Sequence, residues 1–126
     1  MAAAVLVFAL ELSVIAAALT AARDVAQGHR VLAVFQPHLY SRTREFAEAF
    51  CRALEIADLA CVTDVFGARE EPQPGITGAT ITGHAADDRV VSTPSAEEAI
   101  AHVRAIHDRV HGALPDGTRY DANDPA

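Results

Sequence analysis

Short apolar runs alternate with segments of helical periodicity along most of this chain. The run Val31–Phe35 is wholly apolar and β-prone, which is typical of a parallel strand that is buried on both faces. By the same reasoning, we expect strands at Val5–Phe8 and Leu59–Val65 and a short strand at Arg89–Val91. Strands that alternate with helices predict an α/β fold, a Rossmann-like three-layer sandwich with a mostly parallel sheet.

Two helices are predicted between these strands. The first runs from about Ser13 to Gln27, with Ser13 as its N-cap and Gly28 as the residue that ends it. The second runs from about Ser41 to Ile56. Its apolar residues recur at helical spacing and therefore share one face: Phe46, Phe50, Ala53, Leu54 and Ala57.

The rest of the chain holds a predicted loop, a helix and a polar end. The segment Gly67–Gly83 is punctuated by Gly and Pro, so we expect a long loop there. A helix follows Ser95, which can form a capping box with Glu98. The apolar stripe of this helix comprises Ala99, Ile100, Val103, Ile106 and Val110. We therefore expect one domain over residues 1–112 and a polar, disordered tail over residues 113–126.

The N-terminal segment Ala2–Ala22 allows a second interpretation, because its length suits a membrane span or a signal-peptide core. Glu11 lies in the middle of this segment, and no Lys or Arg directly follows Met1. Both features argue against insertion or export. A buried strand and helix are therefore the preferred prediction, and a membrane anchor is the weaker alternative.

Composition and charge narrow the classes of function. The chain has 126 residues and a formal net charge of -7. That length suits a single domain, and the acidic surplus excludes a basic surface for nucleic acid. Cys51 and Cys61 lie in apolar runs without zinc-ligand spacing, so we expect buried thiols in a cytoplasmic protein. His107 and His111 lie one helical turn apart, but without a third ligand we predict no metal site.

Two loops carry the candidate chemistry, because parallel α/β sheets bind ligands at the carboxyl ends of their strands. The first loop, Gln36–Thr43, opens a helix, where free backbone N–H groups and the helix dipole favour an anion. Arg42 and Arg44 can bind a carboxylate or phosphate through paired hydrogen bonds. The second loop, Phe66–Gly78, places Arg69 beside two glutamates. The alternative interpretations are a plain helix cap with solvated arginines and a surface charge cluster.

The same two loops carry a family resemblance. The blocks FQPHLYSRTREF and DVFGAREEPQPGITG, which begin at Phe35 and Asp64, resemble the C-terminal domain of the Mur ligases of peptidoglycan biosynthesis. The match is best to the actinobacterial branch that joins L-alanine to UDP-N-acetylmuramic acid, with Leu39 after the QPH triplet. The resemblance extends from about Ile15 to Val110 and is weak outside the two blocks.

The resemblance implies an ATP- and magnesium-dependent ligase whose C-terminal domain supplies the amino-acid site. In that family two other domains hold ATP and the UDP-sugar. The substrate-binding residues implied here are Gln36, His38, Tyr40, Arg42, Arg44, Ala68, Arg69 and Glu70. Arg42 is the candidate for anchoring the alanine carboxylate or another substrate anion. No catalytic or metal-ligating residue is assigned to this chain.

The sequence also departs from the family pattern. Residues Leu6–Val14 stand where the family has a DDYAHHPTE-like segment, and polar residues follow Val110 where its last strand is expected. The 126 residues contain no GxxxxGK[ST] phosphate-binding motif. We therefore expect a truncated or degenerate ligase domain with an incomplete sheet, inactive alone and without tight binding of ATP or magnesium. The alternative is a small non-catalytic α/β binding module that retains the anion pocket.

Overall fold

The fold is known from a computed structural model that describes residues 3–8 and 12–111, with side chains over residues 14–106. Its elements are β1 (Ala3–Phe8), α1 (Leu12–Ala26), β2 (Arg30–Phe35), α2 (Tyr40–Glu45), α3 (Ala47–Leu54), β3 (Leu59–Val62), α4 (Gly78–Thr82), β4 (Val90–Ser92) and α5 (Ala96–His111). The predicted tail over residues 113–126 lies outside the described residues.

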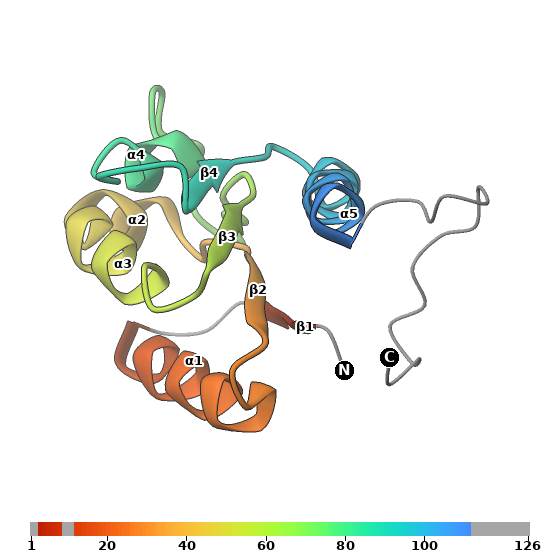
Figure 1. The fold of residues 1–126 in the computed structure, drawn as a ribbon. Helices are drawn as coiled ribbons and strands as arrows, with labels where there is room; N and C mark the ends of the chain where they lie inside the picture. The colour runs from red at the N-terminus through yellow and green to blue at the C-terminus, as the bar shows by residue number, and fades with distance from the viewer. Residues whose placement is uncertain (1–2, 9–11, 112–126) are drawn as a thin grey trace.

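Four parallel strands form one sheet in the order β1-β2-β3-β4. The central register pairs Val34 of β2 with Val7 of β1 and with Cys61 of β3. Strands that follow one another in the chain are neighbours in the sheet, and each pair is joined by a right-handed crossover. The helices in these crossovers therefore lie on one face of the sheet. Helices α1, α3 and α4 lie on that face, and α5 lies on the opposite one (Figure 1). This arrangement confirms the predicted Rossmann-like α/β class.

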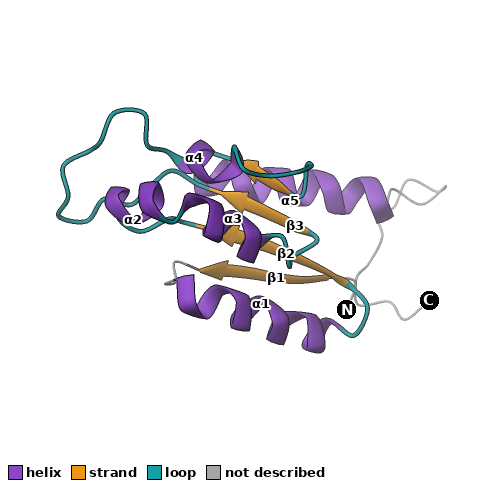
Figure 2. Ribbon diagram, turned by 90° about the vertical axis from the view of Figure 1, so that its left-hand side faces the viewer, coloured by secondary structure: helices purple, strands orange, loops and turns teal. Residues whose placement is uncertain are grey.

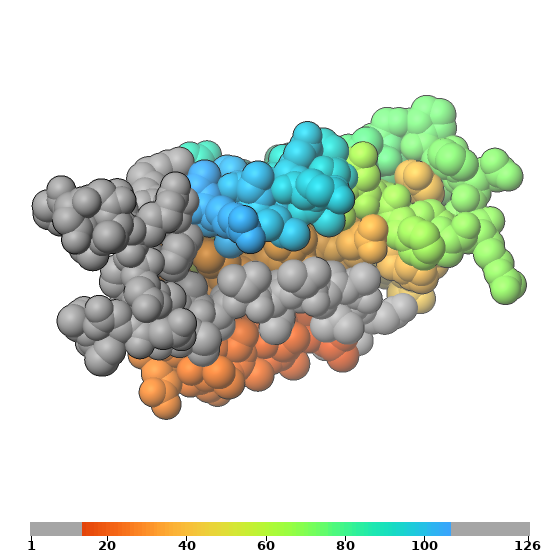
Figure 3. Space-filling model, turned by 90° about the vertical axis from the view of Figure 1, so that its right-hand side faces the viewer, coloured from red at the N-terminus to blue at the C-terminus, as the bar shows by residue number. Residues whose placement is uncertain are grey.

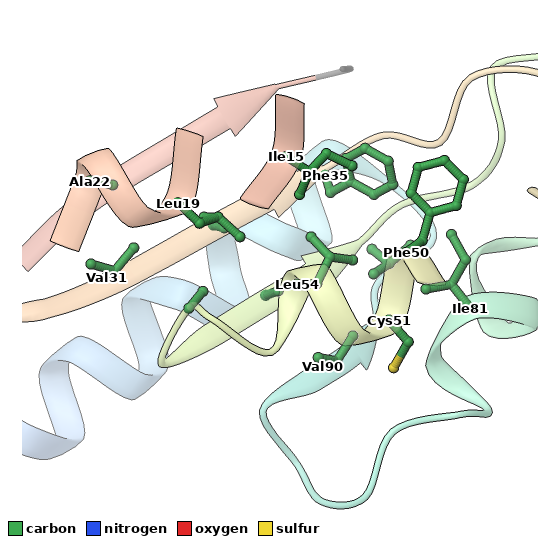
Figure 4. Packing of buried hydrophobic residues seen from close by; sticks show 14 of the residues in the cluster. Ile15, Leu19, Ala22, Val31, Phe35, Phe50, Cys51, Leu54, Ile81 and Val90 are labelled. Carbon is green, nitrogen blue, oxygen red and sulfur yellow. The ribbon is translucent and has the colours of Figure 1, made fainter. Parts of the chain in front are cut away.

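The larger core lies between the sheet and the helices α1, α3 and α4 (Figure 4). Phe35 of β2 packs against Phe50 of α3 with ring centroids 5.4 Å apart. Both cysteines are buried free thiols, as the sequence predicts. Burial raises the pKa of the Cys61 thiol to about 11, so this side chain acts as a small apolar residue at neutral pH.

A smaller core lies under α5, which covers the other face of the sheet (Figure 3). Ala99 and Val103 of α5 pack against Leu32 and Val34 of β2. Ile100 is 50% exposed, so its predicted place in the buried stripe is wrong. Its neighbour Ala99 faces the sheet instead, which turns the Ile100 side chain toward solvent. The predicted stripe residue Val110 lies outside the described side chains.

The predicted helix from Ser41 to Ile56 is two helices, separated at Phe46. Phe46 has φ -112° and ψ 20° and lies at the surface, so it is not part of the buried face. Thr43 of α2 is buried, and its hydroxyl donates a 2.8 Å hydrogen bond to the Leu39 carbonyl. Such a bond to the preceding turn often bends helices, and here it lies in the turn before the break at Phe46.

The segment Gly67–Gly83 is not a loop throughout, because α4 begins at Gly78. Thr77 and Thr80 form a reciprocal capping box, a signal that the Gly and Pro residues of the segment obscured. Strand β3 also ends at Val62, three residues earlier than predicted. The long connection between β3 and α4 extends beyond the end of the sheet, next to α2 (Figure 2).

The N-terminal elements differ from their predicted bounds by a residue or two. Helix α1 begins at Leu12, so Ser13 lies within the helix and is not its N-cap. The helix ends at Ala26, where Gln27 (φ 49°) and Gly28 (φ 88°) turn the backbone into the left-handed region. None of the helices in the described part of the chain has the length and apolar content that crossing a membrane requires.

Candidate functional site

The two predicted loops lie side by side at the carboxyl ends of β2 and β3. His38 and Phe66 form an isolated parallel bridge between them. The Leu39 amide donates to the Phe66 carbonyl at 2.9 Å, and the Phe66 amide donates to the Pro37 carbonyl at 2.9 Å. The His38 imidazole also stacks on the Phe66 ring, with centroids 5.9 Å apart. The loops therefore form one connected unit rather than two independent surfaces.

Both loops contain a residue in a conformation that side chains disfavour. Leu39 has φ 71° and Ala68 has φ 52°, in the left-handed region that suits glycine. Gly67 lies directly against the ring of Tyr40, so a Cβ at position 67 would be only 2.5 Å from the Tyr40 Cε2 atom. Tyr40, a predicted site residue, thus packs closely against the second loop, next to the predicted residue Ala68.

The start of α2, where the sequence predicted an anion, is occupied by a carboxylate of the chain itself. Glu70 accepts a 3.1 Å hydrogen bond from the Ser41 backbone N–H and a second, short one from the Ser41 hydroxyl. These bonds lower the pKa of Glu70 below its usual value, and the Tyr40 backbone N–H and the charge of Arg44 add to the effect. The anion-favouring helix start is therefore real, but Glu70 occupies it.

The arginines of the site point outward from α2 and the second loop. Arg42, Arg44 and Arg69 are all exposed. Arg44 donates from Nη1 to the Gln73 Oε1 at 3.1 Å, which is a second tie between α2 and the second loop. Three guanidinium groups on adjoining segments provide positive charge at this edge, although the chain as a whole is acidic.

A pocket of about 300 Å³ opens on the other side of the same edge, next to the start of α5. Its walls come from the ends of β2 and β3, from the second loop and from the turn after β4: Val34, Gln36, Thr63, Asp64, Val65, Phe66, Pro94, Ser95 and Ala96. Gln36 faces this pocket, whereas the other predicted residues lie along the loops and α2. The structure thus divides the predicted set between two adjoining surfaces.

The pocket includes residues that the sequence reasoning missed. The Ser95 hydroxyl oxygen accepts a 3.1 Å hydrogen bond from the Glu98 backbone N–H, as predicted for a helix cap. Ser95 also lines the pocket. The rule that ligands bind at the carboxyl ends of parallel strands, applied to β4 as well, would have found Pro94 and Ser95. The lining contains the Asp64 carboxylate and no basic side chain, so an anion is disfavoured inside the pocket. The arginines that favour an anion lie outside it.

The described residues do not fit a metal centre. No three His, Cys, Asp or Glu side chains lie close enough together within the described part of the chain to hold a metal ion. The pair His107 and His111 falls outside the described side chains. The polar groups at this edge are guanidinium, amide, hydroxyl, imidazole and carboxylate groups.

This fold and loop edge define a Rossmann-like α/β domain with its polar groups at the carboxyl ends of parallel strands. Comparisons with known proteins then show which proteins the chain is similar to. The chain is 50% identical to UDP-N-acetylmuramate–L-alanine ligase of Paenarthrobacter aurescens over 94 residues, which is 75% of this chain and 21% of that protein. It is 64% identical to the ligase of the same name from Renibacterium salmoninarum over 66 residues, 52% of this chain and 14% of the relative.

A third relative of the same name, from Mycolicibacterium paratuberculosis, is 55% identical over 73 residues, 56% of this chain and 15% of its own length. Over the part that these relatives match, the chain is similar to UDP-N-acetylmuramate–L-alanine ligases, and the resemblance that the two blocks indicate is confirmed. The chain spans about a fifth or less of the length of these relatives.

Another comparison points to a different family. The model of the ER-bound oxygenase mpaB/B'/Rubber oxygenase catalytic domain matches residues 76–126, which is less than half of the chain. That range includes β4, which pairs with β3, and α5, which packs on β2 and β3. The described part of this range therefore packs on the same sheet from which the two ligase-like loops extend. Among the described residues, residues 76–111 do not form a hydrophobic core separate from that sheet.

Proposed function

We propose that this chain is the C-terminal, amino-acid-binding domain of a UDP-N-acetylmuramate–L-alanine ligase. The observation that carries the proposal is the meeting of the two ligase-like loops at one edge of the sheet, bridged at His38 and Phe66. The identity of 47% or more to ligases of that name supports it. In this proposal the protein acts in the cytoplasm, in the synthesis of peptidoglycan.

The proposed ligands are L-alanine and the anionic groups of UDP-N-acetylmuramic acid. Arg42 anchors the alanine carboxylate, because a guanidinium binds a carboxylate through two parallel hydrogen bonds. Arg44 and Arg69 add positive charge beside it, and His38 supplies a polar group at the loop bridge. Gln36 in the pocket holds a neutral polar part of the ligand, since no basic side chain lines that space.

The ligation itself needs groups that these residues do not supply. ATP would phosphorylate the sugar carboxylate, and magnesium would offset the phosphate charge, but the 126 residues hold no GxxxxGK[ST] motif. We therefore propose that the chain binds substrate without catalysing ligation alone. A non-catalytic binding module is the second candidate, favoured by the apolar sequence at Leu6–Val14 where the family has its DDYAHHPTE-like segment.

Calorimetric titration with L-alanine tests the proposed binding role. We expect weak binding by the unaltered chain and a loss of about ten-fold or more in Arg42→Ala, because a hydrogen bond to a charged group contributes about 1.5–3 kcal/mol. Arg104→Ala is the matched control, since Arg104 is also exposed but lies on α5. Equal affinity of the Arg42→Ala and Arg104→Ala variants, or no binding by the unaltered chain, would contradict the proposal.

A further inference from the structure

We propose that Glu70 is a positioning residue that holds α2 against the second loop and so orients Arg42, rather than a group that touches substrate. This inference rests on the proposed function. It changes the role that the family resemblance implied for Glu70, and it assigns a role to Ser41, which the resemblance left without one.

Helix α2 has no side-chain cap of its own. The residue before it is Leu39, which is apolar, has φ 71° and makes no capping hydrogen bond. The first N–H groups of a helix need acceptors, and a carboxylate is a favourable one there. Glu70, 29 residues away from Ser41 in the chain, supplies that acceptor from the second loop.

Both oxygens of the Glu70 carboxylate accept hydrogen bonds from Ser41. Oε1 accepts from the backbone N–H and Oε2 accepts from the hydroxyl. The chain itself therefore holds both oxygens in place, independently of any ligand. A substrate anion would be repelled by the negative charge of Glu70 and attracted by the exposed arginines.

Arg42 lies one residue after Ser41 on the same short helix. α2 has six residues, so the orientation of its first turn decides where the Arg42 side chain starts. Further bonds to the second loop run from the Leu39 amide, directly before α2, to the Phe66 carbonyl and from the Arg44 guanidinium to Gln73. The bond from the Ser41 backbone N–H to Glu70 is made by the residue next to Arg42 in the chain.

The charge of Glu70 gives this tie a pH dependence. Its pKa is lowered mainly by the Ser41 hydroxyl and then by the Ser41 backbone N–H, with Tyr40 N–H and the charge of Arg44 adding to the effect and burial opposing it. A carboxyl with a lowered folded-state pKa stabilises the structure above its unfolded pKa, and the effect is lost as pH falls through the folded value. We therefore expect the tie to hold at neutral pH and to break in acid.

The test follows the Ser41 amide by NMR in the ligand-free chain as pH falls from 7. We expect its chemical shift to change with a midpoint below the ordinary glutamate value of about 4.3. Glu70→Gln should abolish that transition, and Ser41→Ala should move the midpoint of Glu70 upward. Glu71→Gln is the matched control, because Glu71 is an exposed neighbour, and it should leave the transition unchanged.

The second measurement is L-alanine affinity at neutral pH, where all variants are compared in the folded state. We expect Glu70→Gln and Ser41→Ala to weaken binding several-fold and Glu71→Gln to leave it unchanged. The Ser41 transition should also persist with L-alanine bound.

The inference is overturned if Glu70→Gln weakens binding without altering the Ser41 amide, or if bound L-alanine removes the transition. If the unaltered chain shows the transition but binds no L-alanine, the proposed function fails while the Glu70–Ser41 tie stands as a structural bond only.

Discussion

At the scale of single residues, the sequence shows which polar groups gather at the loop edge but not which partners they choose. Glu70 was predicted to be a substrate-binding residue, and the structure shows its carboxylate bonded to Ser41, 29 positions earlier in the chain. Gln36 was grouped with the arginines, and it lines a separate pocket with Ser95. Partners of this kind depend on how two loops fold against each other, which no local pattern encodes.

Gly78 shows a second constraint that acts at one residue. It is buried at the start of α4, and a Cβ there would lie 2.5 Å from the Thr63 carbonyl oxygen and 3.0 Å from that of Val62. Those oxygens belong to backbone at the end of β3 and cannot move away cheaply. We therefore predict that Gly78→Ala lowers the free energy of unfolding by about 1–3 kcal/mol, the range of overpacked cores.

Chemical denaturation followed by circular dichroism measures this effect. Gly83→Ala is the control, because the closest atom to a Cβ at Gly83 is the Ala79 carbonyl oxygen at 3.2 Å and the residue is exposed. The control should change the free energy of unfolding much less. Equal effects of the two substitutions would mean that α4 does not pack on the end of β3 in the way described.

At the scale of elements, the buried strands were the most predictable part of the molecule. β2 is buried along nearly its whole length, so its apolar run is continuous and its bounds match the prediction to one residue. The helices that pack on the sheet, α1 and α5, were also found, because each keeps an apolar face over many turns. Long elements with a continuous buried face are thus readable from the sequence.

The short elements were not predictable in the same way. α4 has five residues and lies among Gly and Pro residues, so its only local signal is the pair Thr77 and Thr80. The break at Phe46 lies in a sequence that is helical on both sides, and the bond from Thr43 to Leu39 that accompanies it appears only in the folded chain. In both places tertiary contacts, rather than periodicity, decide where a helix begins and ends.

At the scale of the whole molecule, the 126 residues contain no phosphate-binding motif for ATP. With ATP, L-alanine and UDP-N-acetylmuramic acid together, we predict no release of inorganic phosphate by this chain. The physical reason is that no Gly-rich loop with its lysine is present in the 126 residues to hold the β- and γ-phosphates. A phosphate assay checks this, with a full-length ligase as the positive control, and turnover by the chain alone would refute the prediction.

The central claim is that the two bridged loops, at one edge of the sheet, form the ligand site of this domain. A titration of the isotope-labelled chain with L-alanine, read by NMR at every amide, tests it most directly. We predict that the largest shift changes fall within residues 36–44 and 64–70, around the His38–Phe66 bridge and α2. Changes confined to α1 or to the outer face of α5, or no changes at saturating L-alanine, would contradict the account.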